Sequence, residues 1–323
     1  MDTTPRPLGP SGLSVGPLGL GCWPLAGMTR TGITPATARA TVAAALEAGI
    51  LHLDTAYCYG ADGESERAIA AAIAGRRDDV FLASKCGIHW EPGRKQCVDG
   101  RPERLRREVA ESLRRLQTDR IDLLYLHAPD PQVPLTESMG ELRRMREEGL
   151  TRCVGVSNVN LEQLAEAHAA AGIAAVQLPY NMLQREIERE IVPWCRSKRV
   201  AVVAYWPLMK GLLAGTMTRD RVFPATDSRH KYPMFSGEEF QRNLDFVEVV
   251  RGEAARLGSA VADVVLAWTA EQPGITSVLF GATDPEQVRT NAAALACTLD
   301  DTARRAIRDA IATRGPVAGR RAV

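Results

Sequence analysis

Short apolar runs recur along the whole chain, separated by segments with a helical pattern. Eight runs of about four to six residues are apolar at nearly every position, which is typical of strands buried on both faces of a parallel sheet. They cover residues 18–21, 51–54, 80–84, 121–126, 153–156, 174–178, 201–205 and 276–280. The pattern therefore predicts eight buried strands.

Amphipathic segments lie between these runs and predict helices. Residues 102–116, for example, place Leu105, Val109, Leu113 and Leu116 on one helical face. Further helices are expected over 34–48, 65–74, 135–145, from 161 onward, and over 186–198, 240–257, 261–271, 285–294 and 299–312. Turn residues before position 18 predict an N-terminal hairpin, and a stretch rich in Gly, Pro and charge interrupts the rhythm at about 209–237.

Regular strand–helix alternation predicts an α/β fold, and eight units without a break in composition favour one closed (β/α)8 barrel over residues 1–323. The long insertion then follows the seventh strand, and residues 315–323 are expected to form a flexible tail. The alternative is a doubly wound open sheet. It is disfavoured because the G-x-G-x-x-G turn of a dinucleotide-binding first unit is missing.

The composition of the chain limits the partners and the cellular location that we expect for the protein. The net charge is +1 with basic residues spread over the chain, so no nucleic-acid partner is expected. No apolar run approaches the roughly 18 residues of a membrane span, and the first residues lack the apolar core of a signal peptide. The seven cysteines form no C-x-x-C pair. These features predict a cytoplasmic protein with reduced thiols, without a membrane partner; they leave its oligomeric state open.

Chemically active side chains follow three of the predicted strands. Asp54, Lys85 and His127 each stand where an apolar run ends, and Tyr59 lies five residues beyond Asp54. The active site of a (β/α)8 barrel lies at these strand ends. The remaining strands are followed there by Trp23, Ser157, Asn158, Gln177, Tyr205 and Gly281.

This set of residues favours proton transfer to a carbonyl oxygen. Asp54 and Lys85 would form a buried ion pair, and the Lys85 ammonium would lower the pKa of the Tyr59 phenol. His127 can donate a hydrogen bond to a substrate oxygen beside that phenol. No side chain is a hydride source, so a reduction would need a cofactor.

Several motifs together resemble the aldo-keto reductases, in order from about residue 7 to 312. They are DTAYCYG (54–60), VFLASK (80–85), LLYLHAPD (123–130), GVSN (155–158), VQLPYN (176–181), AYWPLMKGLL (204–213) and GATDPEQVRTN (281–291). Within that family, the FP-x-x-D-x-R element at 223–229 is most similar to bacterial enzymes of the inositol-utilisation type.

The resemblance implies a nicotinamide-dependent oxidoreductase that reversibly reduces an aldehyde or ketone group of a small carbonyl or sugar-like substrate. It implies Tyr59 as general acid, supported by Asp54, Lys85 and His127. Cofactor contacts are implied for Ser157, Asn158, Gln177, Tyr205, Leu208, Gly211, Leu213, Gly281, Thr283, Gln287 and Asn291. Trp23, Trp90 and Trp206 are expected to line the substrate pocket, with Met28 and Phe235 as further candidates.

Two positions depart from the family pattern. Trp206 follows Tyr205 where a serine is common, which would reshape the pocket floor. Thr283 and Asp284 stand where relatives often carry Lys or Arg on the 2′-phosphate of the cofactor. The resemblance therefore implies NADP(H), and this substitution makes NAD(H) plausible as well. Arg229, Lys231 or Arg289 would be alternative cations.

Other functions remain open at this point. Lys85 would suit a lyase that forms a Schiff base, since such chemistry needs a lysine of lowered pKa. Some relatives act as cofactor-binding auxiliary subunits rather than enzymes. His52 and Asp54 could be imagined as metal ligands, but no second ligand cluster follows the other strands, so no metal is predicted. His52 and His168 are interpreted as core residues.

Overall fold

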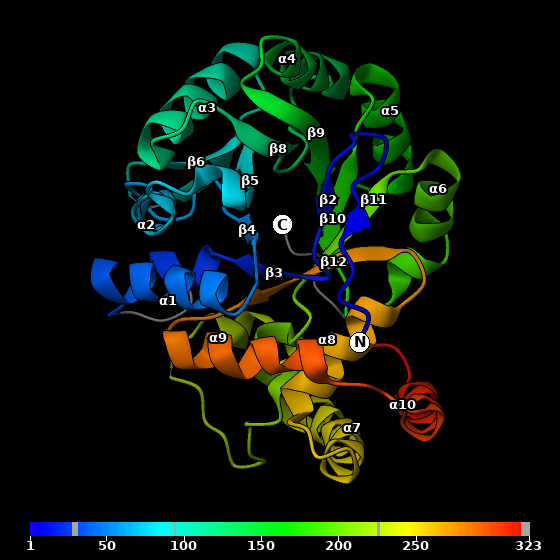
Figure 1. The fold of residues 1–323 in the computed structure, drawn as a ribbon. Coiled ribbons are helices and arrows are strands. Elements are labelled where there is room, and N and C mark those ends of the chain that lie inside the picture. Colours follow the sequence, from blue (N-terminus) through cyan, green and yellow to red (C-terminus); the bar gives the residue numbers. More distant parts are fainter. Residues whose placement is uncertain (28–31, 94, 225–226, 318–323) are drawn as a thin grey trace.

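Eight parallel strands form a closed barrel in the computed structural model, which describes residues 1–27, 32–93, 95–224 and 227–317 (Figure 1). Their order around the barrel follows the sequence, and the last strand pairs with the first. The strands are β3 (Leu18–Gly21), β4 (His52–Asp54), β5 (Phe81–Cys86), β8 (Ile121–Leu126), β9 (Thr151–Ser157), β10 (Ala175–Pro179), β11 (Ala201–Tyr205) and β12 (Ile275–Gly281). The predicted α/β barrel is confirmed, and the open-sheet alternative is wrong.

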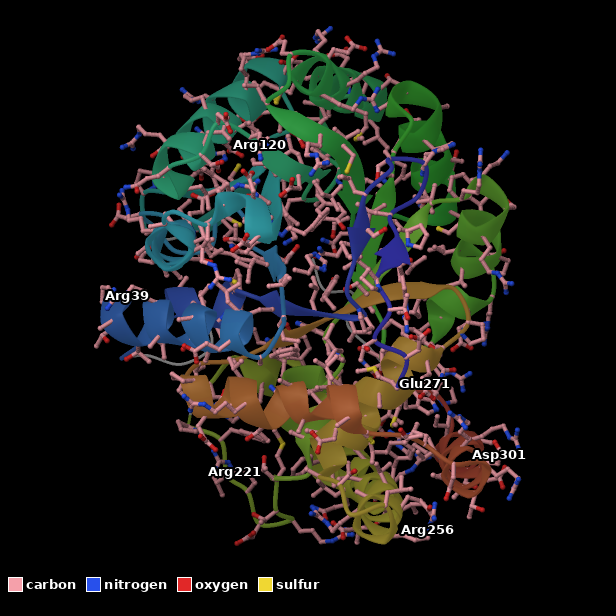
Figure 2. The ribbon with its side chains drawn as sticks, in the orientation of Figure 1. Arg39, Arg120, Arg221, Arg256, Glu271 and Asp301 are labelled. Atoms are coloured by element: carbon pink, nitrogen blue, oxygen red, sulfur yellow. The ribbon has the colours of Figure 1, made fainter. Side chains whose placement is uncertain are left out.

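Helices surround the barrel and bury one face each in the apolar core, and the last of them packs mainly on another helix rather than on the strands (Figure 1). They are α1 (Pro35–Glu47), α2 (Glu64–Ile73), α3 (Pro102–Leu116), α4 (Leu135–Glu147), α5 (Leu161–Ala171), α6 (Ile191–Lys198), α7 (Gly237–Arg256), α8 (Val261–Glu271), α9 (Pro285–Ala292) and α10 (Asp301–Arg314). Several begin at side-chain caps. Thr34 accepts from the Thr37 N–H, and Asn160 and Gln163 form a capping box. Arg39, Arg256 and Asp301 lie on the outside of this helical layer (Figure 2).

The N-terminal hairpin closes one end of the barrel. It pairs β1 (Arg6–Pro7) with β2 (Ser14–Val15), as the sequence predicts. Leu8 and Val15 are buried against side chains from the starts of the barrel strands, among them Ala174 and Ala201. The hairpin therefore fills this end of the barrel. The opposite end, where the strands finish, stays open and can hold an active site.

Two segments differ from the sequence prediction. Residues 186–198 were expected as one helix, but they form a short 3-10 turn (Glu186–Glu188) followed by α6. A continuous helix would place Pro193 in its interior, where proline clashes with the preceding turn; in α6 it lies in the first turn instead. The second difference is a hairpin of β6 (Ile88–Glu91) and β7 (Lys95–Val98), which the sequence pattern did not predict.

The long insertion after β11 packs onto α7. Its described part contains 3-10 turns at Met209–Ala214, Ser228–Lys231 and Pro233–Phe235. Phe223 contacts Phe235 and Phe240 edge-on, at ring-centroid distances of 5.6 and 6.1 Å. These side chains of the insertion and of α7 belong to the main apolar core, which the insertion therefore extends. None of the described helices is long and apolar enough to cross a membrane.

Candidate active site

Four predicted catalytic residues meet at the open end of the barrel. Asp54 ends β4, Lys85 is the second-last residue of β5, and His127 follows β8 directly. Tyr59 lies in the loop after β4, which is fixed to β5 by a 3.0 Å hydrogen bond from the Tyr57 N–H to the Lys85 carbonyl. Neighbouring parallel strands bring these side chains together because their ends lie at the same rim.

Lys85 is the centre of the group. Its Nζ donates to Asp54 Oδ1 at 2.5 Å, to the Thr55 carbonyl at 2.9 Å and to the Tyr59 hydroxyl at 3.2 Å. Asp54 Oδ2 accepts a second bond, from Gln177 Nε2 at 2.7 Å. An ammonium has three donors, so all of them are used. Since Nζ is directed at three fixed acceptors, this arrangement disfavours the nucleophilic amine of a Schiff-base lyase.

The phenol of Tyr59 is held in its protonated form. Burial and the nearby Asp54 carboxylate raise its pKa well above the ordinary value. The sequence pattern predicts that Lys85 lowers the pKa of Tyr59, and for the protein alone that prediction is wrong. Burial was not visible from the sequence, and it disfavours the phenolate more than the neighbouring ammonium favours it.

His127 faces the Tyr59 side chain. The two rings meet edge-on with centroids 5.9 Å apart, and His127 Nδ1 lies 3.6 Å from Cys58 Sγ. Burial and the positive charge of Lys85 lower the pKa of His127 well below its usual value. The imidazole is therefore neutral at neutral pH, with one N–H available as a donor.

A hydrogen-bonded group of side chains from β9, β10 and β11 adjoins this site. Tyr205 OH donates to Asn158 Oδ1 at 2.8 Å, and Asn158 Nδ2 donates to the His127 carbonyl at 2.9 Å. Ser157 Oγ donates to the Gln177 carbonyl at 2.8 Å. The structure thus brings together the four residues expected at the nicotinamide. Their amide and hydroxyl groups beside an aromatic face fit a flat ring carrying a carboxamide.

The other predicted cofactor residues lie on the rim to either side. Gly211 and Leu213 both donate their backbone N–H to the Leu208 carbonyl, in a turn where Gly211 has a φ of +90°. Beyond β12, the Thr283 N–H donates to Gln287 Oε1 at 3.0 Å. Asn291 Nδ2 donates to the Gly281 carbonyl at 3.5 Å. Helix α9 begins between Thr283 and Gln287. The free N–H groups at its N-terminus can bind an anion.

Two of the cations considered for the 2′-phosphate are paired with carboxylates. Arg229 bonds Asp227 at 2.5 Å, and Arg289 lies 3.3 Å from Glu286. Lys210, which the sequence analysis did not single out, lies over the rings of Trp206 and Tyr232 at 4.9 and 5.1 Å. Burial lowers its pKa. Only its position inside the AYWPLMKGLL motif could have drawn attention to it.

Aromatic side chains border the catalytic group. Trp23 meets Tyr59 edge-on at 5.0 Å, and Trp90 Nε1 donates to the Cys58 carbonyl at 2.8 Å. Trp206 follows β11 with a φ of +62°, a conformation rare outside glycine. Phe235 instead packs in the main apolar core, and Met28 lies outside the described residues.

His52 belongs to the barrel interior. Its Nδ1 hydrogen-bonds Ser277 Oγ at 3.1 Å, and burial lowers its pKa to about 3. The predicted role as a hydrogen-bonded core residue is confirmed. His168 packs edge-on against Trp194 at 5.6 Å.

The chain belongs to the aldo/keto reductase family, whose model matches residues 17–312. It is 36% identical to the aldo-keto reductase YhdN of Bacillus subtilis over 281 residues, which is 86% of this chain and 84% of that protein. It is 34% identical to the NADH-specific methylglyoxal reductase of Escherichia coli, covering 91% of this chain and 94% of that one.

Solved structures show the same fold. The glycerol dehydrogenase AKR11B4 from Gluconobacter oxydans superimposes with a TM-score of 0.90 at 33% identity, over 98% of this chain and 97% of that one. A Klebsiella pneumoniae aldo/keto reductase in complex with NADP and acetate gives a TM-score of 0.73 at 28% identity, with 98% of each chain covered. The protein is accordingly an oxidoreductase that acts on carbonyl substrates with a nicotinamide cofactor.

Proposed function

We propose that Tyr59 is the general acid of a reversible carbonyl reduction, positioned by Lys85, Asp54 and His127. The observation that carries this proposal is the Lys85 ammonium, which bonds both the Asp54 carboxylate and the Tyr59 hydroxyl. When bound, the nicotinamide supplies the hydride. The protein then has to deliver a proton to the carbonyl oxygen and to stabilise the negative charge that develops there.

In the reductive direction, the substrate oxygen lies between the Tyr59 hydroxyl and the His127 N–H. Tyr59 gives its proton to this oxygen as the alkoxide develops. Lys85 stabilises the tyrosinate left behind, because its Nζ already lies 3.2 Å from the phenol oxygen. Asp54 and Gln177 keep the ammonium in position. In the oxidative direction the same tyrosinate takes the proton from an alcohol.

We infer that the substrate is a small polar carbonyl compound, with a polyol as the reverse substrate. A glycerol dehydrogenase and a methylglyoxal reductase are among its relatives. The FP-x-x-D-x-R element adds a likeness to the inositol-utilisation type, and its Asp227–Arg229 pair is formed. Trp23, Trp90 and Trp206 would supply flat apolar faces on which the carbon skeleton of a polyol can pack.

We further propose that the enzyme accepts NADPH with weak discrimination against NADH. Asp284 caps α9 by accepting from the Gln287 N–H, so a carboxylate lies where many relatives place a cation. Arg289 is paired with Glu286. The helix N-terminus still favours an anion, but the charge-assisted contact of an arginine is missing.

Replacing Tyr59 tests the catalytic proposal. Tyr59→Phe removes the acid and should lower kcat by at least about 10²–10⁴-fold. Cofactor Kd, measured by fluorescence titration, should stay nearly unchanged, since the phenol acts in the transition state. Tyr57→Phe is the matched control, because that hydroxyl donates to Glu111 on α3 at 3.0 Å and not to a catalytic side chain. Equal turnover in the two variants would show that another group is the acid.

A further inference from the structure

The β6–β7 hairpin has two chemically different faces. In its antiparallel register, His89 lies opposite Cys97 and Trp90 opposite Gln96. Successive strand residues point to opposite sides, so His89, Glu91 and Cys97 share one face. Trp90 points the other way, toward the active site, where it bonds the Cys58 carbonyl. Only the face that carries Trp90 contacts the active site.

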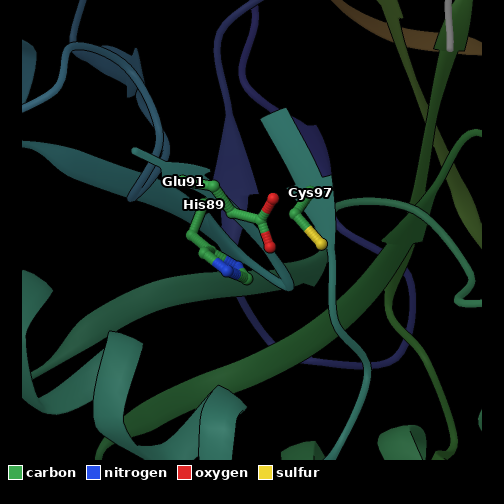
Figure 3. A group of neighbouring side chains, drawn as sticks. All are labelled: His89, Glu91 and Cys97. Atoms are coloured by element: carbon green, nitrogen blue, oxygen red, sulfur yellow. The ribbon is translucent and has the colours of Figure 1, made fainter. Parts of the chain in front are cut away.

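Three metal-binding side chains converge on the other face (Figure 3). One nitrogen of His89, one oxygen of Glu91 and the Cys97 sulfur all lie within 4.8 Å of one another. Glu91 is exposed, and His89 and Cys97 are half-buried, so an ion can reach them from solvent. Cys97 is also the only described cysteine that is not fully buried.

The His89 imidazole is not satisfied by the protein alone. Its Nδ1 is buried and has no hydrogen-bond partner, at 3.6 Å from the Glu108 carboxylate. Glu108 accepts instead from the Gly87 N–H and from Arg104, at 2.7 Å each. Buried polar atoms normally have a partner, so the described residues leave part of the hydrogen-bonding capacity of this imidazole unused.

We propose that His89, Glu91 and Cys97 bind Zn²⁺ or a similar thiophilic divalent ion, although the sequence alone predicted no metal. Imidazole, carboxylate and thiolate are the ligands that zinc takes in proteins, and three of them leave a fourth position for water. Bond lengths of about 2.0 Å to nitrogen and 2.3 Å to sulfur place tetrahedral ligands about 3.5 Å apart. The longest pair in the cluster therefore has to shorten by up to roughly 1 Å, which small rotations of the three side chains can supply.

Zinc at this place fixes the wall of the substrate pocket. Two of its ligands lie on β6 and one on β7, so the ion links the two strands of the hairpin. A two-stranded hairpin is marginally stable by itself. Bound zinc should therefore reduce the opening of β6 and β7, and with it the movement of Trp90 beside Tyr59.

Titration of the full-length, tag-free protein tests this site. After treatment with reductant and chelator, we expect calorimetry to show one Zn²⁺ bound per chain. Co²⁺ as a spectroscopic substitute should give the charge-transfer absorption of a cobalt–thiolate bond. Cys97→Ser should abolish that absorption, and both Cys97→Ser and His89→Gln should weaken Zn²⁺ binding at least about tenfold. Amide exchange in β6 and β7 should slow on adding Zn²⁺ to the unsubstituted protein.

Glu47→Gln is the control, because it removes an exposed carboxylate from α1, outside the cluster. It should leave Zn²⁺ affinity and the cobalt spectrum unchanged. The proposal is overturned if the protein binds no stoichiometric Zn²⁺. It is equally overturned if binding survives both Cys97→Ser and His89→Gln, since the ion would then occupy another place. Both results are independent of the reductase activity.

Discussion

Lys85 shows how much one buried residue can decide. The side chain is 1% exposed, and its charge is compensated by Asp54, itself 3% exposed. A buried ion pair is weak evidence for stability in itself, because both charges lose their hydration. Here the ion pair serves to position Lys85. It holds the ammonium group beside the Tyr59 phenol, which has to become negatively charged during the reaction.

The first prediction at this scale concerns stability. Lys85→Met leaves the buried Asp54 carboxylate with Gln177 as its remaining side-chain partner, which should cost about 3–5 kcal/mol of unfolding free energy. Adding Asp54→Asn removes the stranded charge and should recover a large part of this loss, although both variants stay inactive. Urea unfolding measures both. Equal stability of the single and double variants would contradict the argument.

The second prediction concerns cofactor choice. For the unchanged protein, we expect kcat/KM with NADH within about tenfold of that with NADPH, because one charged hydrogen bond is worth about 1.5–3 kcal/mol. Thr283→Arg should shift the preference toward NADPH by roughly one to two decades. The check is steady-state kinetics with both cofactors. A preference for NADPH above about a hundredfold in the unchanged protein would mean that another cation already holds the phosphate.

At the scale of elements, a buried carboxylate joins α2 to α3. Glu66 on α2 is fully buried and lies 3.3 Å from Arg115 on α3. Burial raises the pKa of Glu66 from 4.5 to about 7, against the opposing effect of Arg115. The contribution of this buried carboxyl group to stability therefore depends on pH.

This pKa gives a pH prediction. Between pH 4.5 and 7 the folded protein keeps a proton on Glu66 that the unfolded chain releases, so stability falls as pH rises through this window. Relative to Glu66→Gln, the unchanged protein should lose about 3 kcal/mol from pH 4.5 to 8. Denaturant unfolding at several pH values measures the difference. Glu103→Gln, at an exposed site on α3, should show no such trend; a similar trend there would exclude Glu66 as the cause.

At the scale of the whole molecule, closure of the barrel depends on small residues facing its interior. A Cβ at Gly155 on β9 would lie 2.6 Å from the Ala175 carbonyl oxygen and 2.7 Å from the Tyr125 ring. A Cβ at Gly19 on β3 would lie 2.8 Å from His52. Glycine at these places lets large side chains of neighbouring strands fill the barrel.

A matched pair of substitutions tests this packing. Gly155→Ala should destabilise the protein by about 1–3 kcal/mol, because two rigid neighbours have to move. Gly140→Ala, on α4, meets nothing within 4 Å and should stabilise by about 0.5–1 kcal/mol through helix propensity. Thermal unfolding of both variants gives the signs. A Gly155→Ala protein as stable as the unchanged one would show that the barrel can widen at little cost.

The sequence by itself determined the order of strands and helices and the residues at the strand ends. Strand and helix periodicities are local, and in a parallel barrel every strand finishes at the same rim. That is why the sequence pattern alone predicts that Asp54, Lys85, His127 and Tyr59 lie together. Caps such as Thr34 and stops such as Gly49 are equally local signals.

Tertiary structure decided the properties that depend on burial and on distances between residues far apart in the sequence. It raised the pKa of Tyr59 where a neighbouring charge alone would lower it. It also formed the β6–β7 hairpin and brought His89, Glu91 and Cys97 within reach of one another. Desolvation and cross-strand distance are properties of the packed molecule, so the order of residues along the chain does not contain them.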